Sequence, residues 1–344
     1  MKIALDAMGG DHAPSAAVDG ALDYLSNIDN SADVILVGNE IAISKLLKGK
    51  SYPSDKIKVI NTTEVVTAND RPSRIFRDKP DSSLVKIVDL VKSGEADAFV
   101  SAGNTGALLV TSLFLLGKIK GIQRPALAPL IPSQKGGFIL CDAGANTDVK
   151  AHHLVQFGIM AQAFIEHLDN RKNPSVGLLN IGQEKTKGNE LTLKAYPMME
   201  EHIKNFIGNI EARYIMDGDV DVVVCDGFVG NQVLKTLEGT ISHMMTWFKE
   251  SVKSHPISKI GLPFLSPVIK DLKSNLDYEE YGATPFLGIN GIGLKSHGST
   301  TKKGIKNALI AAQKAFEENL IEDIAKRISQ HMEIIEEQKI DEKQ

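Results

Sequence analysis

Short apolar runs rich in β-branched residues alternate along the chain with longer segments of helical period. In chain order, the runs are KIALD, DVILVG, KIKVIN, DAFVSAG, GFILCDAG, VGLLNIG and DVVVCDG. Between them, apolar residues recur every three or four positions, for example in segments 16–25 and 84–94, as they do in amphipathic helices. This alternation predicts an α/β fold, with a mainly parallel sheet flanked by helices on both faces.

The C-terminal part of the chain has a longer helical pattern. Apolar residues within segment 305–328 are spaced by three or four positions and predict one long amphipathic helix. The segment that follows, 336–344, is rich in charged residues and is predicted to be frayed. We therefore predict a single α/β catalytic unit over residues 1–335.

One segment, 240–282, breaks the alternation. It begins as a helical pattern and continues with Pro256, Pro263 and Pro267, which a single helix cannot accommodate. The segment is too long for an ordinary βα loop and too apolar for a fully solvated one. We therefore predict that it is an inserted pair of helices that projects from the unit as a hairpin.

The composition is that of an ordinary globular protein, with 42% hydrophobic and 24% charged residues among 344. A net charge of −4 gives no reason to expect nucleic acid as a partner. The sequence has no signal-peptide pattern, and no apolar stretch approaches the about 18 residues of a membrane span. We therefore expect a cytoplasmic protein.

Glycine, asparagine and aspartate follow five of the predicted strands. These turns are AMGGDHAP, AGNTGALL, AGANTD, IGQEKTKGNE and GFVGNQVLK. Because ligands of open α/β sheets bind outside the carboxyl ends of the strands, we expect the five turns to converge on one cleft. Glycine allows backbone N–H groups to approach an anion, and the following helix adds its positive dipole end. The pattern favours a phosphate-binding cleft over plain turn chemistry.

Several common catalytic motifs are missing from the sequence. We find no P-loop, no dinucleotide-binding G-x-G-x-x-G at the first helix and no G-x-S-x-G nucleophile motif. Cys141 and Cys225 each end an apolar run, where a thiol is normally buried and inert. Acyl or phosphoryl chemistry in this protein is therefore predicted to proceed without a cysteine nucleophile.

The first turn, DAMGGDHAP, combines acids, glycines and a histidine. Gly9 and Gly10 are predicted to form a sharp turn that leaves Asp11 and His12 facing the cleft. His12 is a candidate general base, proton donor or anion ligand. The alternative is a capping network in which Asp11 and His12 only satisfy backbone groups at the start of a helix. The residues alone leave both interpretations open.

The turn also resembles the signature of the phosphate acyltransferases of the PlsX family, and further blocks resemble that family in the same order over essentially the whole chain. They are SAGNTGAL, GIQRPALAP, DAGAN, HLVQF, LLNIGQEKTKGNE, FIGNIEAR, DGFVGNQVLKTLEG and LKSHGS. The resemblance implies transfer of a long-chain acyl group from acyl-acyl carrier protein to inorganic phosphate, which gives acyl phosphate for phospholipid synthesis. It also implies a fold like the isocitrate and isopropylmalate dehydrogenases and phosphotransacetylase, a homodimer, and no metal or organic cofactor.

Direct attack of phosphate on a thioester requires an anion cradle, a donor to the oxyanion and a near-attack geometry. Residues of the glycine-rich turns and of LKSHGS have suitable chemistry. As candidate catalytic residues we name His12, Asp11, Lys295, His297 and Asn231. As candidate phosphate-binding or substrate-binding residues we name Gly9, Gly10, Asn104, Thr105, Gly106, Asp142, Asn146, Lys185, Asp226 and Gly230.

Two macromolecular contacts follow from the resemblance. Acyl carrier protein is acidic and would bind a basic patch, and the acyl phosphate would pass to a glycerol-3-phosphate acyltransferase in the membrane. Lysines and apolar residues alternate in the predicted hairpin and are suited to an anionic membrane surface or to the carrier protein; the alternative is burial against a partner subunit. The candidate contact residues are Lys253, Lys259, Leu262, Phe264, Leu265, Val268 and Lys270.

Other functions remain open at this point. A phosphotransacetylase-like transfer from acyl-coenzyme A would use the same cleft. A hydroxy-acid dehydrogenase of the same fold would require a divalent metal and a nicotinamide cofactor. A non-catalytic scaffold at the membrane would have no use for five anion-binding turns.

Overall fold

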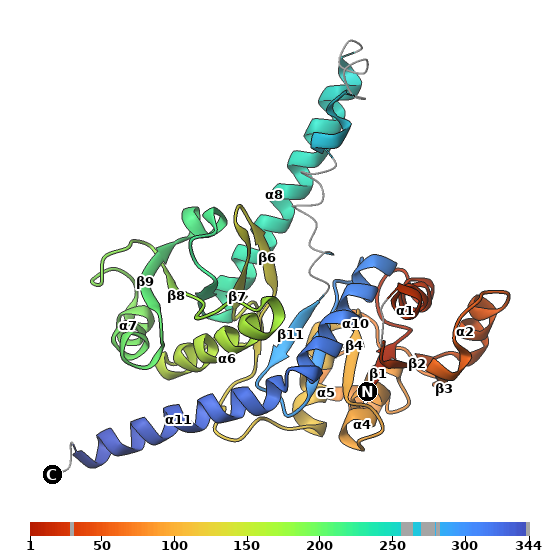
Figure 1. The fold of residues 1–344 in the computed structure, drawn as a ribbon, viewed down its shortest axis with the longest axis horizontal. Coiled ribbons are helices and arrows are strands. Elements are labelled where there is room, and N and C mark those ends of the chain that lie inside the picture. The colour runs from red at the N-terminus through yellow and green to blue at the C-terminus, as the bar shows by residue number, and fades with distance from the viewer. Residues whose placement is uncertain (28–30, 256–263, 270–278, 280–282, 342–344) are drawn as a thin grey trace.

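The strands of the chain form two sheets (Figure 1). The computed structural model describes residues 1–27, 31–255, 264–269, 279 and 283–341. Within this part of the chain, one sheet has the order β3-β2-β1-β4-β12-β11-β5 and the other has the order β6-β7-β10-β8-β9. The strands of the first sheet are β1 (Lys2–Asp6), β2 (Asp33–Gly38), β3 (Ile57–Asn61), β4 (Ala98–Ser101), β5 (Ala126–Leu127), β11 (Thr284–Leu287) and β12 (Ile292–Lys295).

Each sheet, with its helices, forms one lobe of the molecule, and both sheets are mainly parallel. Only the pairs that involve β11, together with the pair β6–β7, are antiparallel among the paired strands that the structure describes. The strands of the second sheet are β6 (Leu130–Ser133), β7 (Gly136–Cys141), β8 (Val176–Asn180), β9 (Phe206–Glu211) and β10 (Val222–Val224). The predicted α/β class with a mainly parallel arrangement is therefore confirmed.

Helices flank both sheets (Figure 1). They are α1 (Ser15–Asn27), α2 (Glu40–Leu47), α3 (Ile75–Asp78), α4 (Ser83–Lys92), α5 (Thr105–Leu115), α6 (Ala151–Asp169), α7 (Glu190–His202), α8 (Gly227–Ser254), α10 (Lys302–Glu317) and α11 (Leu320–Asp341). Short 3₁₀ turns lie at Ser54–Lys56, Pro72–Arg74 and Ala212–Asp217. All seven strands predicted from the apolar runs are present, as β1, β2, β3, β4, β7, β8 and β10.

Helix α6 joins the two lobes. Its residues from His153 to Ile165 are all buried, and the buried amides of Gln156 and Gln162 donate to the Gly121 and Pro174 carbonyls. Phe157 of α6 lies in one hydrophobic cluster with Leu5 and Val100 of the first sheet and Ile139 of the second. The two sheets therefore share a continuous core.

The C-terminal helical pattern forms two helices, so the prediction of one long helix is wrong. Helix α10 ends at Glu317, and Asn319 adopts a left-handed conformation with φ 52° before α11 begins. Asparagine tolerates this conformation better than most residues because its short polar side chain can bond locally. Helix α11 includes residues 336–341 of the segment that we expected to be frayed, and residues 342–344 lie outside the described part.

Helix α8 projects from the body of the molecule (Figure 1). It begins at Gly227, well before the helical pattern that we assigned to the hairpin, because the Asp226 side chain caps it by accepting from the Val229 N–H. Residues 264–269 are also helical. The rest of the predicted hairpin, including Lys259, Leu262 and Lys270, lies outside the described residues.

Candidate active site

Three neighbouring parallel strands, β1, β4 and β12, end at the same edge of the first sheet. The turns that follow them are joined by hydrogen bonds. Asp11 N–H donates to the Gly298 carbonyl at 2.7 Å, and the Ser101 hydroxyl donates to Asp6 Oδ2 at 2.7 Å. The first glycine-rich turn therefore packs against both the SAGN turn and the KSHGS turn.

The Gly9-Gly10 pair allows this close approach. Gly10 has φ +93°, and a Cβ atom there would lie 2.9 Å from both Ala102 Cβ and the Gly298 carbonyl oxygen. A Cβ atom at Gly9 would lie 2.6 Å from the Gly103 nitrogen. The glycines therefore serve to bring three turns into contact, which is a structural reason for the DAMGGD sequence.

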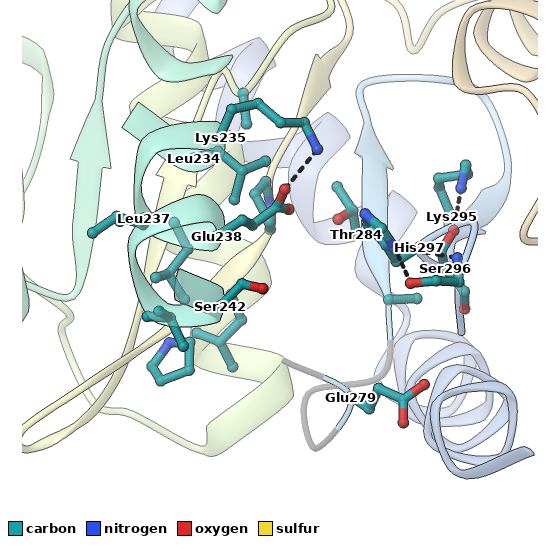
Figure 2. A pocket seen from close by; sticks show the side chains of 18 of the residues that line it. Leu234, Lys235, Leu237, Glu238, Ser242, Glu279, Thr284, Lys295, Ser296 and His297 are labelled. Carbon is teal, nitrogen blue, oxygen red and sulfur yellow. Dashed lines mark hydrogen bonds and ion pairs between the residues drawn. The ribbon is translucent and has the colours of Figure 1, made fainter. Parts of the chain in front are cut away.

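A large pocket lies between α8 and the end of the first sheet. Its volume is about 1020 Å³. Figure 2 shows Leu234, Glu238 and Ser242 of α8 on one side of the pocket and Lys295 and His297 on the other. The polar end of the pocket is lined by Thr105, Gly106, Ala143, Gly144, Asn231, Lys295, Ser296, His297 and Ser299.

Lys295 is the principal cation at this polar end. Its side chain is 8% exposed, and its ammonium group donates to the Ser296 carbonyl. Burial lowers the pKa of Lys295 to about 8, while the negative charge of Asp6 opposes this decrease. Burial likewise raises the pKa of Asp6, against the hydrogen bonds that its carboxylate accepts. A partly desolvated ammonium of this kind is well suited to bind an anion.

His297 is next to Lys295 in the pocket lining. Its Nδ1 accepts from the Ser299 N–H at 3.3 Å, which assigns the proton of the neutral ring to Nε2. Burial lowers the pKa of His297, opposed by the charge of Glu238. The imidazole is therefore held neutral with an N–H donor on its other nitrogen.

Helix α5 begins at the polar end of the pocket. Asn104 caps α5 by accepting from the Ala107 N–H, and its amide donates to the Thr67 carbonyl. Asn104 thus serves the helix cap, while Thr105 and Gly106 of the first turn line the pocket. The first N–H groups of a helix have no acceptor within the helix and favour anions.

Asn231 lies in the first turns of α8 and lines the pocket, as we expected of a catalytic candidate. Its neighbour Gly230 lies so close to the Asp142 carbonyl that no side chain would fit there. Asp226 and Gly230 therefore position the start of α8, and Asn231 presents its side chain at the pocket wall. Asn231 does not itself open the helix, because Asp226 is the cap.

Asp142 and Asn146 hold the turn that follows β7. Asp142 accepts from the N–H groups of Leu127, Gly144 and Ala145, and also from the backbone and side chain of Asn146. The Asn146 amide also donates to the Pro125 carbonyl. The side chains of Asp142 and Asn146 thus form hydrogen bonds that stabilise the turn. The residues of this turn that line the pocket include Ala143 and Gly144.

Asp11 and His12 lie at the rim and are exposed. Neither is among the residues that line this pocket, and their roles stay predictions. The His12 carbonyl accepts from Ser15 Oγ and Ala16 N–H at the start of α1. Asp11 still influences the pocket, because its charge acts on the pKa values of both Lys295 and His297.

Lys185 is remote from the pocket, which corrects our expectation for the turn after β8. Its ammonium pairs with Glu200 at 2.6 Å and lies over the Tyr196 ring on an exposed face. Strand β8 lies beyond β10 from β7 in the second sheet, and no residue of its turn is among those that line the pocket. The turns after β4, β7, β10 and β12 do meet at the pocket.

Several pocket residues were not predicted from the sequence. Lys235 and Glu238 form an ion pair of 2.7 Å beside the polar end (Figure 2). The charge of the buried Asp6 acts on Lys295, and the apolar face of α8 forms much of the wall. The three-to-four spacing of that face is visible in the sequence directly after DGFVGN, and it would have indicated a helix beginning at the site.

The two cysteines have no role as nucleophiles here. Both are buried, and burial raises the pKa values of Cys141 and Cys225 well above the ordinary range, so the thiols remain protonated. Within the described residues, no three His, Cys, Asp or Glu side chains are grouped so that they could hold a metal ion. No helix in that part of the chain is long and apolar enough to cross a membrane.

Comparison with known proteins gives matches over nearly the whole chain. A family model described as "Fatty acid synthesis protein" matches residues 1–323. The chain is 45% identical over 333 residues to a phosphate acyltransferase of Clostridium botulinum, covering 97% of this chain and 99% of that protein. It is 44% identical over 330 residues to a phosphate acyltransferase of Clostridium perfringens, covering 96% of this chain and 97% of that one.

Solved structures of low sequence identity share the fold. The EutD phosphotransacetylase from Staphylococcus aureus has a TM-score of 0.58 at 16% identity, over 91% of this chain and 94% of that chain. A 4-hydroxythreonine-4-phosphate dehydrogenase from Klebsiella pneumoniae has a TM-score of 0.50 at 13% identity, over 92% and 97%.

The fold is the α/β architecture also found in this phosphotransacetylase and in this 4-hydroxythreonine-4-phosphate dehydrogenase. Within that architecture, the full-length sequence match decides the family. The chain belongs to the phosphate acyltransferases of the PlsX family, and it is an acyltransferase.

The contact between the three turns predicts a stability effect at Gly10. Gly10→Ala combines backbone strain with a steric clash, whereas Gly49→Ala (φ +78°, with open space around its Cβ) has the strain alone. We expect Gly49→Ala to cost about 1–2 kcal/mol and Gly10→Ala to cost about 1–3 kcal/mol more. Urea unfolding followed by circular dichroism measures both. Equal losses in the two variants would contradict the proposed contact.

The lowered pKa of Lys295 predicts a pH dependence of anion binding. The ammonium form predominates below pH about 8 and is lost above it, so the KM for phosphate should rise about tenfold per pH unit beyond that point. Lys295→Arg keeps its charge at alkaline pH, and its KM should stay flat there. Steady-state kinetics across this range provide the measurement, and identical profiles for the two proteins would rule out the assignment.

Proposed function

We propose that this protein transfers a long-chain acyl group from acyl-acyl carrier protein to inorganic phosphate, and that it supplies acyl phosphate for phospholipid synthesis. The observation that carries the proposal is the shape of the pocket. A buried cation, a neutral histidine and the N-terminus of α5 form one end, and an apolar wall continues from it along α8. Phosphate fits the first part and an acyl chain fits the second.

Phosphate binding rests on charge and on backbone donors. The Lys295 ammonium supplies a positive charge in a partly desolvated site, where its interaction with an anion is stronger than in water. The N-terminal turn of α5 adds N–H groups at Thr105 and Gly106. Phosphate held between these groups is positioned beside Asn231, which donates to the developing oxyanion.

The chemistry is a direct displacement. An oxygen of the phosphate dianion attacks the thioester carbonyl carbon, a tetrahedral oxyanion forms, and collapse of that intermediate breaks the carbon–sulfur bond. The proton that phosphate carries ends on the thiol of the leaving carrier protein, so the atoms and charges balance. Because both cysteines are buried and their pKa values are raised, the reaction forms no acyl-enzyme on a cysteine.

His297 assists the departure of the thiol. Its ring is neutral and carries hydrogen on Nε2, so this N–H donates a hydrogen bond to the departing sulfur, while the phosphate proton passes to that sulfur as the carbon–sulfur bond breaks. A lowered pKa suits this role because it keeps the ring neutral. Lys295 keeps its charge throughout and stabilises the phosphate.

The carrier protein docks at the open end of the pocket, where Lys249 and Lys253 of α8 face its acidic surface. Phe264, Leu265 and Val268 are exposed on the helical stretch 264–269, and they rest on the membrane surface from which a glycerol-3-phosphate acyltransferase takes the product. The protein acts as a homodimer, which accounts for the exposed aromatic Trp247 on the side of α8 away from the pocket.

The reaction is tested with palmitoyl-carrier protein and phosphate, without added metal or nucleotide, and with acyl phosphate trapped by hydroxylamine. We expect turnover with this donor, and Lys295→Ala should lower kcat/KM for phosphate by about 10²–10³-fold. Lys185→Ala removes an exposed lysine of the other lobe and is the matched control, with less than about a twofold change. Turnover with palmitoyl-coenzyme A alone would favour phosphotransacetylase activity, and none with either donor would refute the proposal.

Membrane contact is tested by co-sedimentation with vesicles that contain phosphatidylglycerol. Phe264→Glu and Leu265→Glu place charges on the exposed apolar surface and should abolish most of the binding. Ile181→Glu changes an equally exposed apolar residue, 79% against 83% for Phe264, on the lobe of the second sheet and should leave binding unchanged. Equal binding of all three folded variants would show that the surface has another purpose.

A further inference from the structure

Helix α8 carries an apolar stripe along the face that lines the pocket. The members of the stripe are three or four residues apart, and most are half-buried, with Phe248 more exposed. Such spacing places side chains on one face of a helix. The stripe consists of Leu234, Leu237, Ile241, Met245, Phe248 and Val252.

The stripe is continuous with the polar end of the pocket. Asn231 lies one turn before Leu234, and both line the same cavity as Lys295 and His297. Figure 2 shows Leu234 and Ser242 on the helix facing Thr284 and Lys295 across the open space. Apolar residues of other elements also line the cavity, namely Leu109, Leu127, Pro129, Leu130, Ile131, Pro132 and Ile269. One end of this cavity is therefore suited to an ionic group, and the remainder is suited to a hydrocarbon chain.

The straight axis of α8 gives the stripe a length scale. A helix rises about 1.5 Å per residue, which places Ile241 about 15 Å and Met245 about 21 Å from Asn231 along the axis. An extended polypeptide advances about 3.5 Å over three backbone bonds, so an extended hydrocarbon chain advances about 1.2 Å per bond. An acyl chain whose carbonyl lies beside Asn231 therefore reaches Ile241 with about 12 carbons and Met245 with about 17 carbons.

We propose that α8 measures the length of the acyl chain, with the hydrocarbon lying along the stripe and Met245 facing its methyl end in long-chain substrates. The inference rests on the proposed function, because it places the reacting carbonyl at the polar end of the pocket. The distance from Asn231 along α8 then sets the longest chain that is fully buried. Each methylene group that loses its place in the groove weakens binding by about fourfold.

Two other occupants of the groove are conceivable on physical grounds, a second copy of this chain and a membrane lipid. The lining favours the acyl chain over both. The groove ends at a buried cation and a neutral histidine beside the catalytic candidate Asn231, and its cavity of about 1020 Å³ is a pocket rather than a flat face. Neither a dimer contact nor a lipid tail would require a buried cation and a neutral histidine at the end of the groove.

Three substitutions by tryptophan shorten the groove from different positions. We expect Met245→Trp, Ile241→Trp and Leu237→Trp to reduce the longest well-used donor progressively, in that order, in assays with saturated acyl-carrier proteins of eight to eighteen carbons. A variant that excludes four methylene groups should lower kcat/KM for the longest donor by on the order of 10²-fold and leave the shortest donors unaffected. Met244→Trp is the matched control, because Met244 is 59% exposed and does not line the pocket.

A second measurement does not depend on the reaction. Calorimetric binding of free saturated fatty acids of the same lengths should show the same order of cut-offs in the three variants. If the wild-type protein makes acyl phosphate but all the variants keep its chain-length profile, the inference about α8 fails and the proposed function stands. If no donor reacts yet the fatty-acid cut-offs move in this order, the proposed function fails and the groove assignment stands.

Measurement of the oligomeric state tests whether a second copy of the chain covers the stripe. Light scattering of the three variants should match that of the wild-type protein. Dissociation into smaller species together with unchanged cut-offs would show that a second copy covers the stripe, which would overturn the inference.

Discussion

The burial of the Lys295 ammonium group at the carboxyl edge of β1, β4 and β12 is the constraint around which the site is built. A cation in this position is tolerated because the carboxylate of Asp6, itself buried, lies in the same region and opposes the loss of charge. Asp6 in turn is held by the Ser101 hydroxyl and the Met8 N–H. The glycines of the first turn are needed so that these groups can lie so close together.

The second element of the site, α8, depends on a different set of contacts. Asp142 organises the turn after β7, and the first turn of α8 packs on the Asp142 carbonyl through Gly230. This contact fixes the direction of α8 relative to the first sheet. As a result, the apolar face of α8 and the Lys295 side chain line the same pocket. Both sheets thus contribute residues to the pocket, and these residues meet only in the folded chain.

The sequence predicted the local features well because they depend on neighbouring residues. Strands and the turns that follow them are visible in apolar runs and glycines, and Lys295, His297 and Asn231 were correctly placed at a cleft. The turn of Lys185 was misplaced because its composition does not show which strands of the second sheet end at the pocket; β7 and β10 do, and β8 does not. The order of strands within a sheet is a long-range property that no local pattern of residues reports.

The errors at the helices have similar causes. The break between α10 and α11 depends on a single left-handed residue, Asn319, inside an uninterrupted amphipathic pattern. The apolar stripe of α8 was visible, but the prolines that follow it suggested a separate hairpin, although the helix begins at the site itself.

The most direct test of the account is a crystal structure of the protein with a long-chain acyl phosphate or a stable analogue. The account predicts phosphate oxygens within hydrogen-bonding distance of Lys295 Nζ and the first turn of α5, with the hydrocarbon chain along α8 toward Met245. A ligand bound at the turn of Lys185, or one with its phosphate at the apolar end of the groove, would contradict it.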